Sequence, residues 1–233
     1  IIDKTTYELA LEEELPGKPF PLPDYSPHFT EKIKKEYPGK QIESTIDFRL
    51  QNKVNNIVKD HHRNLKHNEI HNIAVLVLDV NTKEVLTYVG NSPTTAQHHN
   101  FVDIVQRSRS MGSVLKPLLF ASMLDAGEIL PATLVADIPT SINGYQPQNF
   151  DRKYYGAVPA DVALARSLNV PSVRMLRAYN YQRFYNDLKK TDLKSLDKPA
   201  DYYGLSLILG GAEGSLWEIT KTYAGMASAL NFY

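Results

Sequence analysis

The chain has 233 residues, enough for one large domain or two small ones whose core needs no disulfide or metal to support it. Basic and acidic side chains number 26 each, so the formal net charge is zero and no basic field indicates nucleic-acid binding. Cysteine is absent, which excludes disulfides and thiolate metal sites. The sequence has no run of about 18 apolar residues that would predict a membrane-spanning helix.

Taken in chain order, the first predicted element is an amphipathic helix within residues 1–15. Four prolines then fall within residues 16–23, a density that excludes helix and suits an extended linker. We therefore predict a boundary here, with residues 1–27 as the remnant of an upstream domain plus linker, and residues 28–233 as the main domain. Because Ile1 stands inside a helical pattern, we expect the chain to be a piece of a longer protein.

The next predicted elements are a strand, a helix and a hairpin. Residues 42–47 alternate and predict a short strand, which leads into a helix over about residues 48–65. Two β-rich runs, residues 73–80 and 85–89, flank a short polar turn and predict a β-hairpin. The first run is apolar on both faces, which favours a sheet that is covered on both sides.

From Ser113 onward the pattern is mostly helical. A helix is expected to begin at Ser113, because apolar side chains recur behind it in one stripe that includes Leu115, Leu119 and Met123. The further predicted helices cover residues 158–167, 172–179, 181–189 and 216–230.

The first candidate for chemistry is Ser113-Val114-Leu115-Lys116. Positions i and i+3 share a helix face, so Lys116 can hydrogen-bond Ser113. A serine is a weak nucleophile until a base takes its proton, and a partly desolvated lysine can be that base. Backbone N–H groups at a helix start also favour an oxyanion. The alternative interpretation is a capping serine beside a solvated lysine.

The second candidate is Ser167-Leu168-Asn169, which precedes Val170-Pro171. Proline disfavours helix at the residue before it, so the triplet is expected at a corner between two helices. There the Ser167 hydroxyl can relay a proton, and the Asn169 amide can hold the lysine and a substrate carbonyl. The alternative interpretation is an ordinary capping turn.

Together the two motifs resemble the nucleophile and second motif of serine β-lactamases and penicillin-binding proteins. The segments that carry the resemblance to class A penicillin-binding proteins extend over most of the chain. They are Thr45-Ile46-Asp47, residues 88–90, residues 109–117, Asp137-Ile138-Pro139, residues 145–151, residues 165–173, residues 203–206 and residues 209–213.

The resemblance implies an α/β (α+β) fold of the penicillin-binding and serine β-lactamase type, with an antiparallel sheet flanked by helices plus a helical subdomain. It implies a D,D-transpeptidase that cross-links peptidoglycan stem peptides on glycan strands. Ser113 would be the acylated nucleophile and Lys116 its base; Ser167 would relay the proton and Asn169 would position the substrate amide. Penicillin and other β-lactams would acylate Ser113, and no cofactor or metal is implied.

The same resemblance implies that the parent is a bifunctional glycosyltransferase/transpeptidase, with residues 1–27 left from the glycosyltransferase side. That parent would be anchored in the inner membrane and face the periplasm. Two alternatives stay open: a serine β-lactamase or D,D-carboxypeptidase, and a non-catalytic penicillin-binding sensor.

The third family motif, Lys-Thr-Gly or Lys-Ser-Gly, does not occur before Tyr233. Lys221-Thr222-Tyr223 is no substitute, because tyrosine prevents the close backbone approach that glycine allows and the segment has a helical pattern. We therefore expect the chain to stop before its C-terminal part, so that one wall of the site has no residues to assign.

Histidines invite a metal interpretation, which the spacing does not support. His61, His62 and His67 fall on or beside a polar helix face, and His98-His99 fall in a loop. No H-E-x-x-H or similar ligand set occurs, so we expect solvated surface histidines and no metal site.

Overall fold

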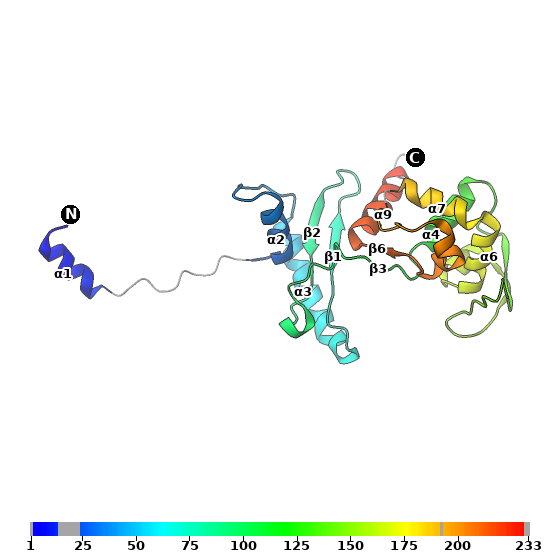
Figure 1. The fold of residues 1–233 in the computed structure, drawn as a ribbon, viewed down its shortest axis with the longest axis horizontal. Helices are drawn as coiled ribbons and strands as arrows, with labels where there is room; N and C mark the ends of the chain where they lie inside the picture. Colours follow the sequence, from blue (N-terminus) through cyan, green and yellow to red (C-terminus); the bar gives the residue numbers. More distant parts are fainter. Residues whose placement is uncertain (1, 14–23, 192, 231–233) are drawn as a thin grey trace.

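The computed structural model describes residues 2–13, 24–191 and 193–230. Figure 1 shows two bodies: a β-hairpin with its helices, and a larger helical body that contains the C-terminal half. The first helix, α1 (Lys4–Glu12), lies apart from both bodies, and none of its side chains is buried. Asp3 accepts a hydrogen bond from the Thr6 amide and begins this helix. The proline-rich stretch of the predicted linker, residues 16–23, lies outside the described residues.

The first body is built on the predicted hairpin. Strands β1 (Val75–Leu78) and β2 (Val85–Val89) pair antiparallel, with Val75 opposite Val89 and Leu76 opposite Tyr88. The Asp79 carboxylate accepts hydrogen bonds from two amides of the turn, Asn81 and Thr82. The hairpin prediction is therefore confirmed.

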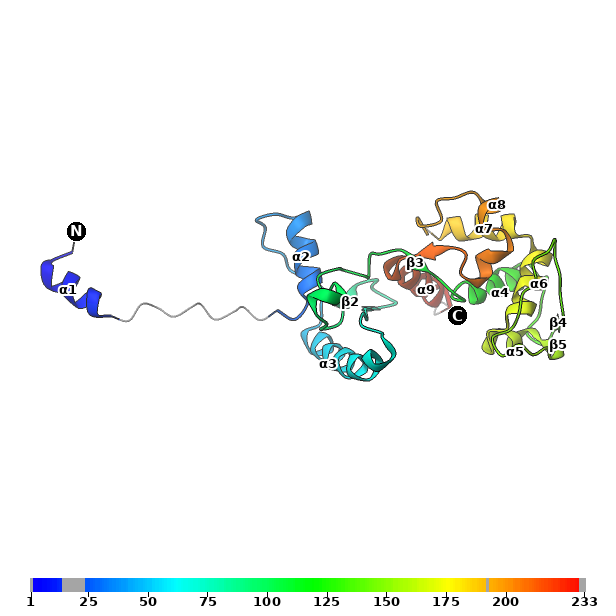
Figure 2. The same cartoon turned by 60° about the horizontal axis from the view of Figure 1, so that its bottom comes forward.

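Helices cover both faces of the hairpin. On one face, Val54 and Val58 of α3 (Phe48–Leu65) pack with Val89. On the other face, Leu76 and Tyr88 pack with side chains that include Phe29 of α2 (Pro27–Glu36) and Trp217. The prediction of a sheet covered on both sides is correct, and Figure 2 shows α2 and α3 beside β2.

The strand predicted for residues 42–47 is wrong. This segment has no strand structure and touches the hairpin through the Asp47 amide, which donates to the Leu86 carbonyl at 3.0 Å, and the Thr45 hydroxyl. One backbone bond does not make a ladder, because an antiparallel pair needs repeated exchange of N–H and C=O groups. The alternating residues 42–47 therefore lie along the edge of β2 without pairing with it as a strand.

The second body is a helical bundle with a small hairpin at one end. Its helices are α4 (Lys116–Asp125), α5 (Ala160–Ala165), α6 (Asn169–Tyr179), α7 (Tyr181–Lys190), α8 (Ala200–Tyr203) and the 3₁₀ helix Gly204–Leu209. Buried side chains from α4, α6, α7 and the 3₁₀ helix form one core, which contains Leu115, Leu119, Leu176, Phe184 and Leu207. The predicted apolar stripe behind Ser113 is thus confirmed as core.

Three predicted boundaries in this body need correction. Residues 156–159 form β5 (Gly156–Pro159), which pairs antiparallel with β4 (Leu134–Asp137), so the helix predicted from 158 begins at 160. Helix α6 begins at Asn169 rather than 172, because proline is tolerated in the first helical turn. Helix α4 begins at Lys116 rather than Ser113.

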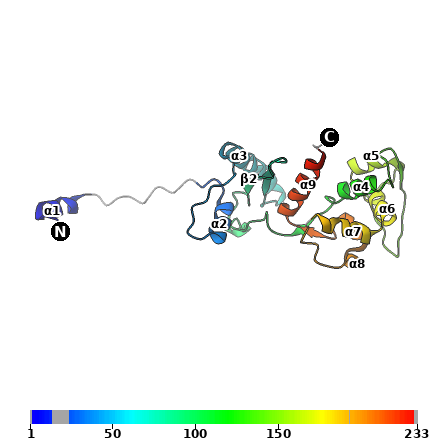
Figure 3. The same cartoon turned by 90° about the horizontal axis from the view of Figure 1, so that it is seen from above.

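Helix α9 (Leu216–Leu230) joins the two bodies. Its first turn packs Leu216 and Trp217 on the hairpin, whereas Ile219 and Met226 pack against the core of the helical bundle. Figure 3 shows α9 between the two bodies from above. The short strands β3 (Arg109–Ser110) and β6 (Glu213–Gly214) pair beside it and add a second connection.

Candidate active site

Ser113 lies in a tight turn that leads directly into α4. The Lys116 amide donates to the Ser113 carbonyl at 3.1 Å, an i to i+3 bond of the 3₁₀ type, and the Leu119 amide donates to Leu115 at 3.1 Å. The helical pattern of bonding therefore begins one turn after the serine. The Ser113 amide makes no hydrogen bond within the described part of the chain.

Close backbone packing fixes this turn from the N-terminal side. A Cβ atom added to Gly210 would lie 2.7 Å from the Cα of Gly112, so no other residue fits there without movement. Gly210 has a φ of +94°, which also favours glycine. The Ser110 hydroxyl donates to the Gly210 carbonyl at 2.8 Å, and the Met111 amide donates to Ala212 at 3.1 Å.

Helix α9 fixes the turn from the other side. The Tyr223 hydroxyl donates to the Val114 carbonyl at 2.6 Å, across 109 positions of sequence. Burial raises the pKa of Tyr223, so this phenol stays protonated and able to donate. The helical interpretation of Lys221-Thr222-Tyr223 is confirmed, and its tyrosine supports the segment that holds Ser113.

Lys116 is buried and fully hydrogen-bonded. Only 3% of the Lys116 surface is exposed. The ammonium Nζ donates to the Ser167 carbonyl at 2.8 Å, to the Ser167 hydroxyl at 3.1 Å and to Asn169 Oδ1 at 2.7 Å. These three acceptors match the three N–H bonds of a charged lysine.

None of the acceptors around Lys116 carries a charge, so burial dominates its titration. Desolvation lowers the pKa of Lys116 from 10.5 to about 8. Near neutral pH a useful fraction of the amine is therefore unprotonated. A neutral amine has a lone pair and can accept a proton from a hydroxyl, which a fully bonded ammonium cannot do.

The corner between α5 and α6 is shaped so that Ser167 faces Lys116. The Ser167 amide donates to Leu164 at 2.8 Å and the Leu168 amide donates to Ala163 at 2.9 Å, the paired bonds of a Schellman ending. Ser167 has a φ of +52° at the position where helices usually place glycine. A serine here costs strain but supplies a hydroxyl and a carbonyl to the lysine.

Asn169, the first residue of α6, is held so that its amide oxygen faces the lysine. Its Nδ2 donates to the Gln148 carbonyl at 2.9 Å, which leaves Oδ1 for Lys116. Its own backbone amide donates to Asn149 Oδ1 at 2.9 Å. The predicted corner is thus confirmed, although the helix starts earlier than the proline suggested.

The structure brings three of the four predicted residues into one hydrogen-bonded cluster: Lys116, Ser167 and Asn169. Ser113 lies in the adjoining turn, and the expected hydrogen bond from Lys116 to its hydroxyl is absent among the described residues. The three donors of the ammonium are bonded to Ser167 and Asn169 instead. Sequence reasoning assigned no role to Asn149 or Tyr223, because both act through partners far away in the chain.

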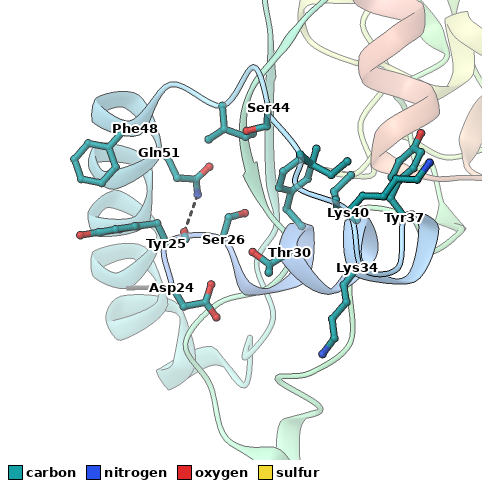
Figure 4. Close-up of a pocket in the computed structure, with 15 residues that line it drawn as sticks. Asp24, Tyr25, Ser26, Thr30, Lys34, Tyr37, Lys40, Ser44, Phe48 and Gln51 are labelled. Carbon is teal, nitrogen blue, oxygen red and sulfur yellow. Dashed lines mark hydrogen bonds between the residues drawn. The ribbon is translucent and has the colours of Figure 1, made fainter. Parts of the chain in front are cut away.

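A separate cavity of about 550 Å³ lies in the first body, between α2, the start of α3 and residues 37–46. Figure 4 shows Gln51 at its wall, where Nε2 donates to the Tyr25 carbonyl at 3.3 Å. The same side chain bonds both the amide and the carbonyl of Tyr88, so it satisfies the outer edge of β2. None of the four candidate residues lines this cavity. Its wall includes Gln51, which hydrogen-bonds to the hairpin.

His61, His67 and His99 are exposed, as expected, whereas His62 and His98 are half-buried. The ring centroids of His71 and His98 lie 3.6 Å apart in a stack, and Nε2 of His62 is buried with no hydrogen-bond partner among the described residues. Across the described ranges, no group of three or more histidine, cysteine, aspartate or glutamate side chains is placed to hold a metal ion. Within the same ranges, every helix is too short or too polar to cross a membrane.

Comparison with known proteins agrees with this geometry. Residues 73–224 match the penicillin binding protein transpeptidase domain. Penicillin-binding protein 1C of Escherichia coli K12 is 32% identical over 217 residues, which cover 93% of this chain and 28% of that protein. Penicillin-binding protein 1B of Haemophilus influenzae is 28% identical over 200 residues, 82% of this chain and 25% of that protein. The chain thus spans about a quarter of the length of these relatives.

Solved structures of penicillin-binding proteins have a similar fold. The penicillin-binding protein PonA1 from Mycobacterium tuberculosis superposes with a TM-score of 0.66 at 19% identity, covering 85% of this chain and 54% of that one. The likeness to protein 1C is also indicated by Asn149-Phe150-Asp151 and residues 210–213. The matched domain contains the Ser113 turn, the buried lysine and the Ser167–Asn169 corner, and the chain belongs to the transpeptidase domain family of the penicillin-binding proteins.

Proposed function

We propose that this chain is the D,D-transpeptidase part of a bifunctional peptidoglycan synthase and that Ser113 is its acylated nucleophile. The observation that carries the proposal is the buried Lys116, held by Ser167 and Asn169 one turn after Ser113. A desolvated lysine one turn after a serine, at the start of a helix, is one arrangement that can activate the serine hydroxyl.

In the first stage, the Ser113 hydroxyl oxygen attacks the carbonyl carbon of the penultimate D-alanine in a stem peptide. The neutral amine of Lys116 takes the hydroxyl proton. The bond to the terminal D-alanine nitrogen breaks, and Ser167 relays a proton to that leaving amine. In the second stage, an amine of a neighbouring stem peptide attacks the acyl-serine, forms the cross-link and frees the serine.

The Ser113 amide and the Asn169 side chain offer hydrogen-bond donors for these steps. The unbonded amide of Ser113 is available as one donor of an oxyanion hole. Asn169 uses Oδ1 for the lysine and one Nδ2 hydrogen for Gln148, so its second hydrogen is available to a substrate carbonyl. The second oxyanion donor would come from a strand that carries the third family motif, C-terminal to Tyr233.

The proposal extends to the setting of the protein. Residues 1–27 would continue from a glycosyltransferase domain, and the parent would be anchored in the membrane and act on glycan strands at the periplasmic face. A mycobacterial relative of the same fold is known in complex with penicillin V. In this chain, penicillin and other β-lactams would form a slowly hydrolysed ester with Ser113.

The test is a reaction of the intact protein with peptidoglycan precursor, in which D-alanine release and cross-linked dimer are measured together. Equal amounts of both are expected, and Ser113→Ala should abolish both. Ser141→Ala is the matched control, since Ser141 is exposed and has no hydrogen bond among the described residues.

Other outcomes of this assay select the alternatives. Release of D-alanine without dimer would identify a carboxypeptidase, and rapid turnover of penicillin would identify a β-lactamase. A stable penicillin adduct without D-alanine release would identify a binding or sensor module.

A further inference from the structure

A buried polar pair lies behind the Ser167–Asn169 corner. Asp137, at the end of β4, is fully buried, and Asn149 is 3% exposed. Asn149 Nδ2 donates to Asp137 Oδ1 at 2.9 Å and Oδ2 at 3.0 Å, and also to the Lys153 carbonyl at 2.8 Å. Burying such groups is costly unless they are hydrogen-bonded, and these bonds offset that cost.

The side-chain amide oxygen of Asn149 faces the start of α6. Its Oδ1 accepts from the backbone amides of Asn169 at 2.9 Å and Val170 at 3.2 Å. Those amides need a capping group, and the residue at the N-cap position, Leu168, has an apolar side chain. Asn149 therefore caps α6 from 20 residues away in sequence.

Gln148, the residue before Asn149, also binds Asn169. The Gln148 carbonyl accepts from Asn169 Nδ2, so adjacent residues of one loop bind both the main chain and the side chain of Asn169. An amide can rotate by a half-turn and exchange its oxygen and nitrogen. With Nδ2 held by Gln148, Oδ1 faces the Lys116 ammonium, and the opposite orientation would place a donor against a donor.

The loop is itself braced. The Tyr155 amide donates to Asp137 Oδ2 at 3.0 Å, and the Arg152 amide donates to the Asn149 carbonyl at 3.0 Å. The guanidinium of Arg166, next to Ser167, lies 3.8 Å from the centre of the Tyr155 ring. One loop thus contacts the corner on both sides of Ser167.

We propose that Asp137 and Asn149 are positioning residues of the transpeptidase site, which hold Asn169 so that its amide oxygen fixes Lys116. The inference rests on the proposed function, and it adds two buried groups to that site. Neither residue touches the reacting atoms. Their effect passes from the Asp137 carboxylate to Asn149, then to Asn169, and then to the lysine.

The test measures the rate constant of acylation by a fluorescent penicillin across pH, in the intact protein, for wild type, Asn149→Ala and Asp137→Asn. Either change should slow acylation by about 10²-fold, the scale that a misplacement of 1 Å can cause. The midpoint of the pH profile should also rise from about 8 toward 10.5, because a loosened site admits water to Lys116.

The control is Asn180→Ala, which removes a cap of the same residue type from the neighbouring α7. It should lower stability and leave the rate constant and pH midpoint of the folded fraction unchanged. Wild-type rate and midpoint in Asn149→Ala, or an equal shift in Asn180→Ala, would overturn the inference. Failure of wild type to acylate at Ser113 would instead contradict the proposed function.

Discussion

Lys116 is the proposed base of the site. It is buried among neutral acceptors, and no ion pair in the described part of the chain includes it. Its pKa in the folded protein, about 8, lies below the ordinary value of 10.5. Between these two pH values the unfolded chain binds more protons, so deprotonation of Lys116 stabilises the fold as pH rises through this window. Below pH 8 that contribution is absent.

The acylation rate should follow the same group. If the neutral amine of Lys116 is the base, the rate constant for penicillin acylation should rise about tenfold per pH unit below its pKa and level off above pH 8. Stopped-flow fluorescence over this range measures it. Lys116→Met should acylate far more slowly at every pH, whereas Lys194→Met, a change at an exposed lysine, should leave the profile unaltered. A wild-type rate independent of pH would exclude Lys116 as the base.

At this scale the sequence predicted part of the site. The pairs Ser113–Lys116 and Ser167–Asn169 are local motifs, and their resemblance to the motifs of penicillin-binding proteins predicted that they share one site. Asn149 could not be assigned a role, because its capping of α6 is a contact across 20 residues of chain that local pattern does not reveal. The occupied donors of Lys116 were likewise unpredictable, since the positive φ of Ser167 sets which carbonyl faces the lysine.

The elements that support Ser113 are short, and close approach rather than length stabilises them. Strands β3 and β6 pair over two positions, Arg109 with Gly214 and Ser110 with Glu213. Such a pair has little stability of its own. It is supported by the close approach of Gly112 to Gly210, which sets how near the Ser113 turn lies to the 3₁₀ helix.

Gly210→Ala should therefore disturb the site more than its size suggests. The new methyl group would meet the backbone of Gly112 at 2.7 Å at a φ of +94°, so we expect a destabilisation of about 1–3 kcal/mol and slower acylation. Gly225→Ala is the matched control in α9, where a Cβ would meet nothing within 4 Å. It should stabilise the protein by about 0.5–1 kcal/mol. Urea unfolding measures both, and a neutral Gly210→Ala would contradict the close-packing account.

Element predictions succeeded where the periodic pattern was long. Helices α3 and α9 have the predicted bounds, and the β1–β2 hairpin has its predicted turn. The pairs β3–β6 and β4–β5 were missed, because strands of two to four residues carry too little alternation to be recognised. Residues 42–47 alternate in polarity and lie along the edge of β2. Periodicity alone cannot distinguish such a segment from a strand that pairs with β2.

At the scale of the whole molecule, α9 packs on both bodies and on the turn that holds Ser113. It packs Trp217 on the hairpin, Ile219 on the helical core, and Tyr223 on the turn after Ser113. The edge of β2 is closed by Gln51 and Thr45, so this side of the hairpin needs no further strand. None of this arrangement was predictable from local pattern, since the contacts join segments about 100 residues apart.

The central claim is that Ser113, Lys116, Ser167 and Asn169 form one acylation site. The most direct test is peptide mapping by mass spectrometry after the intact protein reacts with penicillin. The predicted result is a single adduct on Ser113, which disappears in Ser113→Ala and forms more slowly in Asn169→Ala. An adduct on another residue, or one that persists in Ser113→Ala, would contradict the assignment.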